Sequence, residues 1–103
     1  MSKTYALVYY GGGMPEGEEA QQAVTAAWLA WFGKLGERVV DGGNPFGPSA
    51  VVGSATPASG ATGYSIITAE DLADATALVE DGHPHIGSGN DARVEVYEVF
   101  PAM

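Results

Sequence analysis

The 103-residue sequence contains no cysteine, which excludes a disulfide framework and thiol chemistry. Basic residues are also scarce: 4 lysines and arginines stand against 13 acidic residues, so the formal net charge is −9. A nucleic-acid-binding protein needs a basic face to displace counterions from phosphate, and an anionic membrane would repel an acidic surface. We therefore expect neither nucleic acid nor a membrane among the partners of this protein.

Long apolar runs are missing as well. No stretch approaches the roughly 20 apolar residues that a spanning helix requires, and the N-terminus does not show the pattern of a secretion signal. These features predict a cytoplasmic protein. Apolar residues make up 46% of the sequence, which is ample for a folded core. The length predicts a single domain over residues 1–103, small enough for oligomerisation to complete its core.

Four segments have the composition of β-strands. Tyr5–Tyr10 and Tyr64–Thr68 are rich in aromatic and β-branched residues and are apolar on both faces, which is typical of strands in the centre of a covered sheet. Glu37–Asp41 begins another strand, which Ser49–Gly53 would continue. The last strand lies within Ala92–Phe100, and its better alternation indicates an edge position.

Two segments have helical periodicity. The first runs from Glu18 to about Leu35 and ends at a glycine C-cap, Gly36. Its apolar positions are Ala20, Ala23, Val24, Ala27, Trp28, Trp31 and Leu35, with Leu29 and Phe32 widening the stripe. The second opens at Ala69-Glu70-Asp71 with Thr68 as N-cap and ends at Asp81-Gly82. Its inward stripe consists of Leu72, Ala75, Leu78 and Val79.

The resulting order, β-α-β-β-α-β, predicts an α+β fold of the ferredoxin-like type with an antiparallel sheet. In that topology the first and third strands are central, and these are the two strands with apolar residues on both faces. Two helices cover only one face of a four-stranded sheet. We therefore expect a homodimer in which a second copy covers the other face.

An ordered series of short motifs spans nearly the whole chain. It consists of Tyr5–Tyr10 followed by Gly11-Gly12-Gly13, then Ala27–Phe32, Leu35-Gly36, Asp41-Gly42-Gly43-Asn44-Pro45, Gly63–Ile67, and His83-Pro84 before Val94-Glu95-Val96. In these motifs the chain resembles the YCII-related family. The resemblance implies a dimeric α+β barrel, with two ferredoxin-like sheets packed face to face.

The resemblance also implies a difference in chemistry. Some members of the family are proposed to use a histidine in the first helix and an aspartate before a proline near the last strand. One branch is linked to removal of chloride from an aromatic ring compound. In this chain Trp28 matches the histidine and His83 replaces the aspartate. We expect a separate subgroup, to which that activity does not transfer.

His83 and His85 are the two histidines of the chain, and both flank Pro84. Pro84 favours an extended conformation that would turn both imidazoles to the same side. His83 would act as an acid or base at a pocket wall, since imidazole titrates near neutral pH, with His85 beside it. Two alternatives stay open. One is a metal site through both rings, although no clear third ligand is present; the other is a helix-end cap whose ring satisfies backbone carbonyls.

Other candidate residues surround the same predicted cleft, between the sheet and the first helix. Asp41 and Asn44, with the glycines between them, would bring a carboxylate and an amide to its rim, or simply form a turn. Tyr9, Trp28 and Trp31 would line an apolar ligand pocket or the core, and in a small barrel they would serve both. Gly11-Gly12-Gly13 lacks the spacing of a phosphate-binding loop.

These residues favour one function and leave two others open. The leading hypothesis is a protein that binds, and in one version transforms, a small organic molecule in this cleft without a cofactor. A non-catalytic dimeric interaction or sensing module is the first alternative. The second alternative is a metal-dependent enzyme acting through His83 and His85.

Overall fold

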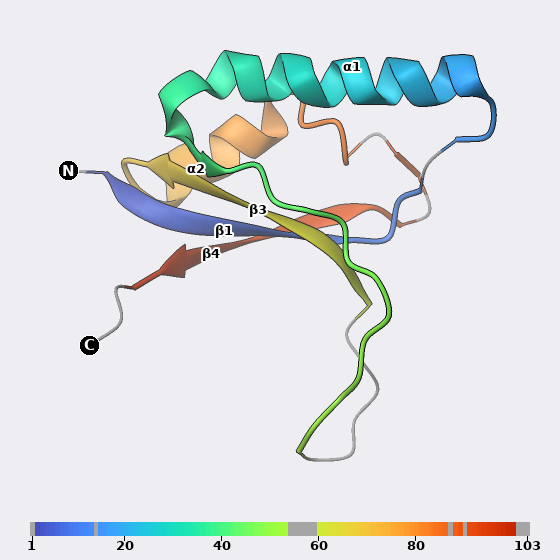
Figure 1. The fold of residues 1–103 in the computed structure, drawn as a ribbon. Helices are drawn as coiled ribbons and strands as arrows, with labels where there is room; N and C mark the ends of the chain where they lie inside the picture. Colours follow the sequence, from blue (N-terminus) through green and yellow to red (C-terminus); the bar gives the residue numbers. More distant parts are fainter. Residues whose placement is uncertain (1, 14, 54–59, 87, 90, 101–103) are drawn as a thin grey trace.

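The computed structural model describes residues 2–13, 15–53, 60–86, 88–89 and 91–100. The strands of its sheet are β1 (Lys3–Tyr10), β2 (Val39–Asp41), β3 (Ala61–Ala69) and β4 (Arg93–Val99). Their spatial order is β2-β3-β1-β4, and every neighbouring pair is antiparallel. The helices α1 (Glu18–Leu35) and α2 (Leu72–Glu80) lie on the same side of this sheet (Figure 1). The predicted ferredoxin-like α+β fold is confirmed, with β1 and β3 central and β4 at an edge.

The core lies between the sheet and the two helices. Alternate residues of the central strands point toward the helices and pack against apolar side chains of α1 and α2. The buried cluster consists of Tyr5, Leu7, Tyr9, Trp31, Leu35, Ile67, Ala69, Ala75 and Val79. Because every other position of β1 and β3 enters this core, the positions between them fall on the opposite face of the sheet.

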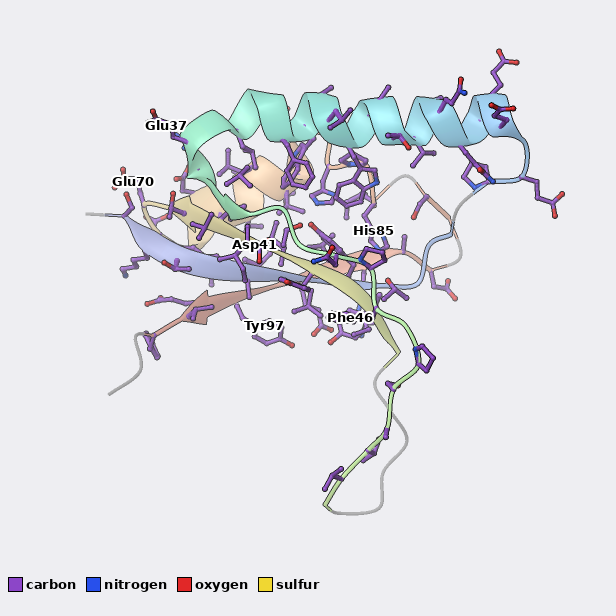
Figure 2. The ribbon with its side chains drawn as sticks, in the orientation of Figure 1. Glu37, Asp41, Phe46, Glu70, His85 and Tyr97 are labelled. Atoms are coloured by element: carbon purple, nitrogen blue, oxygen red, sulfur yellow. The ribbon has the colours of Figure 1, made fainter. Side chains whose placement is uncertain are left out.

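That opposite face carries no helix among the described residues. Val8 pairs with Tyr64 and Ala6 with Ile66 across the two central strands, and all four residues are only half-buried. Tyr97 lies beside Ala6 on β4 and is 51% exposed. Figure 2 shows Tyr97 on the side of the sheet that faces away from α1. The face is apolar and uncovered in the single chain.

Helix α1 ends at its predicted glycine C-cap, whereas α2 begins later in the sequence than predicted. Gly36 (φ 58°) ends α1, and its N–H donates to the carbonyl of Phe32. Thr68 is not an N-cap, because it belongs to β3. The N-cap is Asp71, whose Oδ1 accepts the backbone N–H of Asp74 at 2.8 Å. The reason is that β3 extends further along β1 than its composition indicated.

Three predicted core positions of α1 and one of α2 are exposed. Ala23, Ala27 and Leu29 of α1 are exposed, and Leu29 is 67% exposed, whereas Ala27 borders the cavity described below. Leu72 is 53% exposed because it lies in the first turn of α2, at the edge of the core. The core-facing stripe of α1 is therefore narrower than its periodicity predicted.

The connection between β2 and β3 also differs from the prediction. Residues 36–38 form a turn of 3-10 helix, so β2 begins at Val39 rather than Glu37. Ser49–Gly53 is not a strand, because the prolines and glycines of residues 45–48 lead the chain away from the sheet, on the side opposite α1 (Figure 1). β3 begins at Ala61, three residues before the predicted start at Tyr64, and residues 54–59 lie outside the described residues.

Candidate functional site

A cavity of about 790 Å³ lies between α1 and the sheet, where the sequence predicted a cleft. One wall is the inner face of α1, with Val24, Trp28 and Phe32. Six glycines contribute peptide backbone to the rest of the lining, five from the β1–α1 and β2–β3 connections and one from β3. These glycines are Gly11, Gly12, Gly13, Gly42, Gly43 and Gly63. The volume lies within the range of small-molecule sites, roughly 300–1,000 Å³.

The lining of this cavity has no fixed charge. Among the described residues that line it there is no lysine, arginine, aspartate or glutamate. The polar side chains are neutral hydroxyls, one amide, from Asn44, and one imidazole, from His85. Such a cavity suits an apolar molecule with few polar groups, since a buried ion without a partner is costly.

Some of the candidate residues predicted from the sequence line the cavity, and others do not. Tyr9, Trp28, Asn44 and His85 line the cavity, whereas Trp31, His83 and Asp41 are not among its lining residues. Figure 2 shows His85 on the α1 side of the sheet.

The carboxylate of Asp41 is engaged in hydrogen bonds to neighbouring residues. Its Oδ1 accepts the N–H of Gly43 at 2.8 Å, and its Oδ2 accepts the hydroxyl of Tyr64 at 3.3 Å. The side chain is exposed and shapes the turn after β2. This matches the turn that the sequence offered as the alternative to a catalytic carboxylate.

The segment that carries both histidines is a turn and not an extended strand. The N–H of Ile86 donates to the carbonyl of His83, and the N–H of Ser88 donates to the carbonyl of His85. Both imidazoles nevertheless lie against the same ring, with centroids 5.0 Å from that of Tyr9. The predicted shared side is therefore present, although the turn and not an extended backbone produces it.

His83 is buried behind the cavity and is only 3% exposed. Its ring centroid lies 4.1 Å from that of Trp31 and 4.8 Å from that of Trp28. The backbone N–H of His83 donates to the carbonyl of Val79 at the end of α2, so His83 does lie at the helix end. Among the described residues, the contacts of its ring include no backbone carbonyl, so that part of the helix-cap alternative is wrong. Instead, its Nδ1 accepts the backbone N–H of His85 at 3.0 Å, and its Nε2 lies 3.0 Å from the hydroxyl of Tyr9.

These contacts belong to a buried chain of hydrogen bonds in which the donor and the acceptor of each bond can be assigned. Because His83 Nδ1 accepts an N–H, the neutral ring carries its proton on Nε2 and donates to the Tyr9 hydroxyl. Tyr9 in turn donates to Ser65 Oγ at 2.6 Å, and Ser65 donates to the carbonyl of Gly42 at 2.8 Å. The chain joins the segment after α2 to β1, β3 and the connection after β2.

Burial keeps both titratable members of this chain neutral. Desolvation, with a smaller electrostatic contribution from His85, lowers the pKa of His83 from 6.5 to about 3. Desolvation raises the pKa of Tyr9 to about 12, against the opposing effect of its hydrogen bond with Ser65. At neutral pH, His83 is therefore an uncharged donor and Tyr9 an intact hydroxyl.

Ser65, which belongs to the hydrogen-bond chain behind the cavity, was not predicted from the sequence. It is fully buried and accepts the hydroxyl of Tyr9. A signal was present, because strand alternation puts Ser65 on the same face as Ile67, and a hydroxyl on a core-facing position requires a hydrogen-bond partner.

The two positions that differ from the YCII-related pattern lie next to each other. The rings of Trp28 and His83 meet edge to face at 88°. In this chain an aromatic contact therefore occupies the place that the resemblance assigns to a histidine and an aspartate.

The histidines are poorly arranged for a metal ion. Both nitrogens of His83 are used in hydrogen bonds, and Nε2 of His85 lies 2.8 Å from the carbonyl of Tyr10. Within the described part of the chain, no group of three or more His, Cys, Asp or Glu residues is placed to hold a metal. This arrangement disfavours the metal-dependent enzyme that the sequence left open as an alternative.

The fold and the cavity define a ferredoxin-like α+β protein with an uncharged, ligand-sized cavity between helix and sheet. Comparison of structures finds a similar fold in 5-chloro-2-hydroxyhydroquinone dehydrochlorinase (TftG) from Burkholderia phenoliruptrix AC1100, in complex with 2,5-dihydroxybenzoquinone. The match has a TM-score of 0.57 and 23% sequence identity and covers 95% of each chain. No protein-family model matches the chain, and no curated protein is significantly similar in sequence.

Proposed function

We propose that this protein binds a small, uncharged organic molecule in the cavity between α1 and the sheet. The observation that carries the proposal is an aromatic-walled cavity of about 790 Å³ without a charged side chain among its described lining residues. The bound complex of the similar dehydrochlorinase supports small-molecule binding on this fold. Any transformation of the molecule would use groups that reach the cavity, such as His85, while His83 would act through Tyr9.

We also propose that the chain is a member of the YCII-related family, in a subgroup without the His/Asp pair. The fold and the ordered motifs support membership, and the dechlorinating activity in the name of the similar protein agrees with one branch of that family. The Trp28–His83 contact supports a separate subgroup, because neither ring reproduces the pair. A cytoplasmic location is part of this proposal, and none of the described helices is long and apolar enough to cross a membrane.

Binding in the cavity is tested with 1-methoxynaphthalene, a neutral ring compound, followed by NMR titration. We expect saturable shifts at Tyr9, Trp28 and His85. Ala27→Phe should weaken binding about tenfold or more, because Ala27 lines the cavity and a larger side chain would fill it. Ala30→Phe is the matched control, since Ala30 is exposed on the same helix and is not among the lining residues.

Equal effects of the two substitutions, or shifts that do not saturate at these residues, would contradict a binding site in the cavity.

We further propose a homodimer in which a second copy covers the bare face of the sheet. Apolar side chains occupy that face on three adjacent strands. In addition, Phe46 stacks on Tyr64 at 5.7 Å and is 47% exposed. The same face also carries a charge pair on β4, where Arg93 contacts both the Tyr10 ring and Glu95, the residue paired with Val8. This combination of apolar area and a fixed charge pair is typical of an interface. The same face would serve the alternative function, a dimeric interaction or sensing module.

Sedimentation velocity tests the dimer. The wild-type chain should sediment as a dimer at micromolar concentration, and Val8→Asp should produce a folded monomer, because it places a charge in the middle of the face. Leu29→Asp is the control, since it changes an exposed leucine on α1. A wild-type chain that stays monomeric at micromolar concentration, and whose stability does not depend on protein concentration, would contradict the proposal.

A further inference from the structure

We infer that His85 holds the bound molecule through Nδ1, as a hydrogen-bond acceptor fixed in one tautomer, and that the molecule is an uncharged ring compound with an O–H or N–H donor. The inference rests on the proposed function of the cavity and names the chemistry of its occupant.

The tautomer follows from the partner of the other ring nitrogen. Nε2 of His85 lies 2.8 Å from the backbone carbonyl of Tyr10. A carbonyl oxygen only accepts hydrogen bonds, so Nε2 carries the proton. In the neutral ring Nδ1 is then unprotonated and has a lone pair. The backbone of β1 thus determines which nitrogen of His85 is the acceptor.

The position of the His85 ring is fixed by contacts of both its backbone and its imidazole. The backbone N–H of His85 donates to His83 Nδ1, and the His85 ring lies against Tyr9. Ser88 donates its only hydroxyl proton to the carbonyl of His85 at 2.7 Å, so this hydroxyl does not serve the ring. Among the described residues, the hydrogen bonds of His85 involve its N–H, its carbonyl and Nε2, and none involves Nδ1.

The unprotonated edge of the ring lies near a glycine of the cavity lining. A Cβ atom on Gly12 would stand 2.7 Å from Cε1 and 3.2 Å from Nδ1 of His85. The same Cβ would stand 2.3 Å from the hydroxyl of Ser88, so Gly12, Ser88 and the unprotonated edge of His85 meet closely. All three residues line the cavity, which places this edge at its boundary. Gly12 also has a φ of 73°, a conformation that favours glycine.

The cavity limits what can donate to this acceptor. A cation would meet no carboxylate on the described lining, and an anion would meet no lysine or arginine and would approach a chain of net charge −9. An uncharged O–H or N–H donor has neither penalty. The rings of Trp28 and Phe32, together with the glycine backbone in the lining, favour a flat molecule.

The tautomer is tested first in the unaltered protein, by the ¹⁵N chemical shifts and long-range couplings of the histidine rings at pH 7.5. We expect the pattern of a neutral ring protonated on Nε2 for His85. A ring protonated on Nδ1 would overturn the inference without touching the proposed function, and this measurement requires no variant.

The donor is tested with three probes that share one ring system: 1-naphthol, 1-methoxynaphthalene and 1-naphthoate. We expect 1-naphthol to bind about tenfold more tightly than 1-methoxynaphthalene, which cannot donate, because one neutral hydrogen bond is worth about that factor. The anionic 1-naphthoate should bind more weakly than both. In His85→Phe the advantage of 1-naphthol should disappear, while 1-methoxynaphthalene still binds.

The outcomes separate the two proposals. If 1-naphthol and 1-methoxynaphthalene bind equally to the wild-type chain, or if the advantage persists in His85→Phe, the role of His85 is wrong and the cavity remains a binding site. If no probe binds at the cavity residues, the proposed function itself fails.

Discussion

Replacing Gly43 with alanine is expected to destabilise the fold by about 4 kcal/mol or to prevent folding. A Cβ atom at this position would stand 1.6 Å from the carbonyl oxygen of Tyr64 and 2.6 Å from its carbonyl carbon. Both atoms are backbone of β3, so relief would require β3 to shift within the sheet. Gly43 also has a φ of 80°, which adds strain for any other residue.

Chemical denaturation measures this effect, with Gly47→Ala as the matched control on the same connection. A Cβ on Gly47 would meet nothing within 4 Å, so its substitution should change stability by less than about 0.5 kcal/mol. A Gly43→Ala chain within about 1 kcal/mol of the wild type would show that β2 and β3 are not packed as described.

Acidification from pH 7 to pH 4 is expected to lower the free energy of unfolding by about 3 kcal/mol through His83 alone. The pKa of His83 is about 3 in the folded chain and 6.5 in an unperturbed histidine. Between these values the unfolded chain binds the proton more readily than the folded chain. The contribution of His83 is therefore complete above about pH 6.5 and is lost progressively as the pH falls toward 3.

Urea denaturation of the wild type and His83→Gln at several pH values isolates this contribution. Glutamine does not titrate, and the carboxylates are the same in both chains, so the difference between the two curves reports on His83. The variant should be less stable at pH 7, where it loses the bond from the His85 N–H, and should depend less on pH. Parallel curves, or a His83 ring in the wild type that titrates near 6.5 by NMR, would contradict its burial as a neutral group.

The sequence predicted most of the architecture because strand and helix periodicity are local properties. The bounds of α1 and the central places of β1 and β3 follow from apolar spacing and from the faces that each strand presents. The start of α2 was wrong, because pairing with β1 extends β3 to Ala69. Such pairing depends on a partner that is distant in the sequence.

The candidate site was predicted only in part, for a similar reason. Tyr9, Trp28, Asn44 and His85 were placed at a cleft, and the structure has them on a cavity wall. Composition does not distinguish a ring on that wall from a ring buried behind it, so His83 was predicted at the place that His85 occupies. The separation depends on the turn after α2, which comes from backbone hydrogen bonds.

The uncharged cavity wall has a consequence for how an occupant arrives. The chain has an excess of negative charge, and the acidic residues Glu18 and Glu19 begin α1 close to the cavity rim at Pro15. A neutral molecule crosses that field without electrostatic work, whereas an anion is slowed and a cation is drawn to the outside and then meets no counter-charge within. The entrance would thus act as a charge filter, and the entry rate of a neutral molecule would be almost independent of ionic strength.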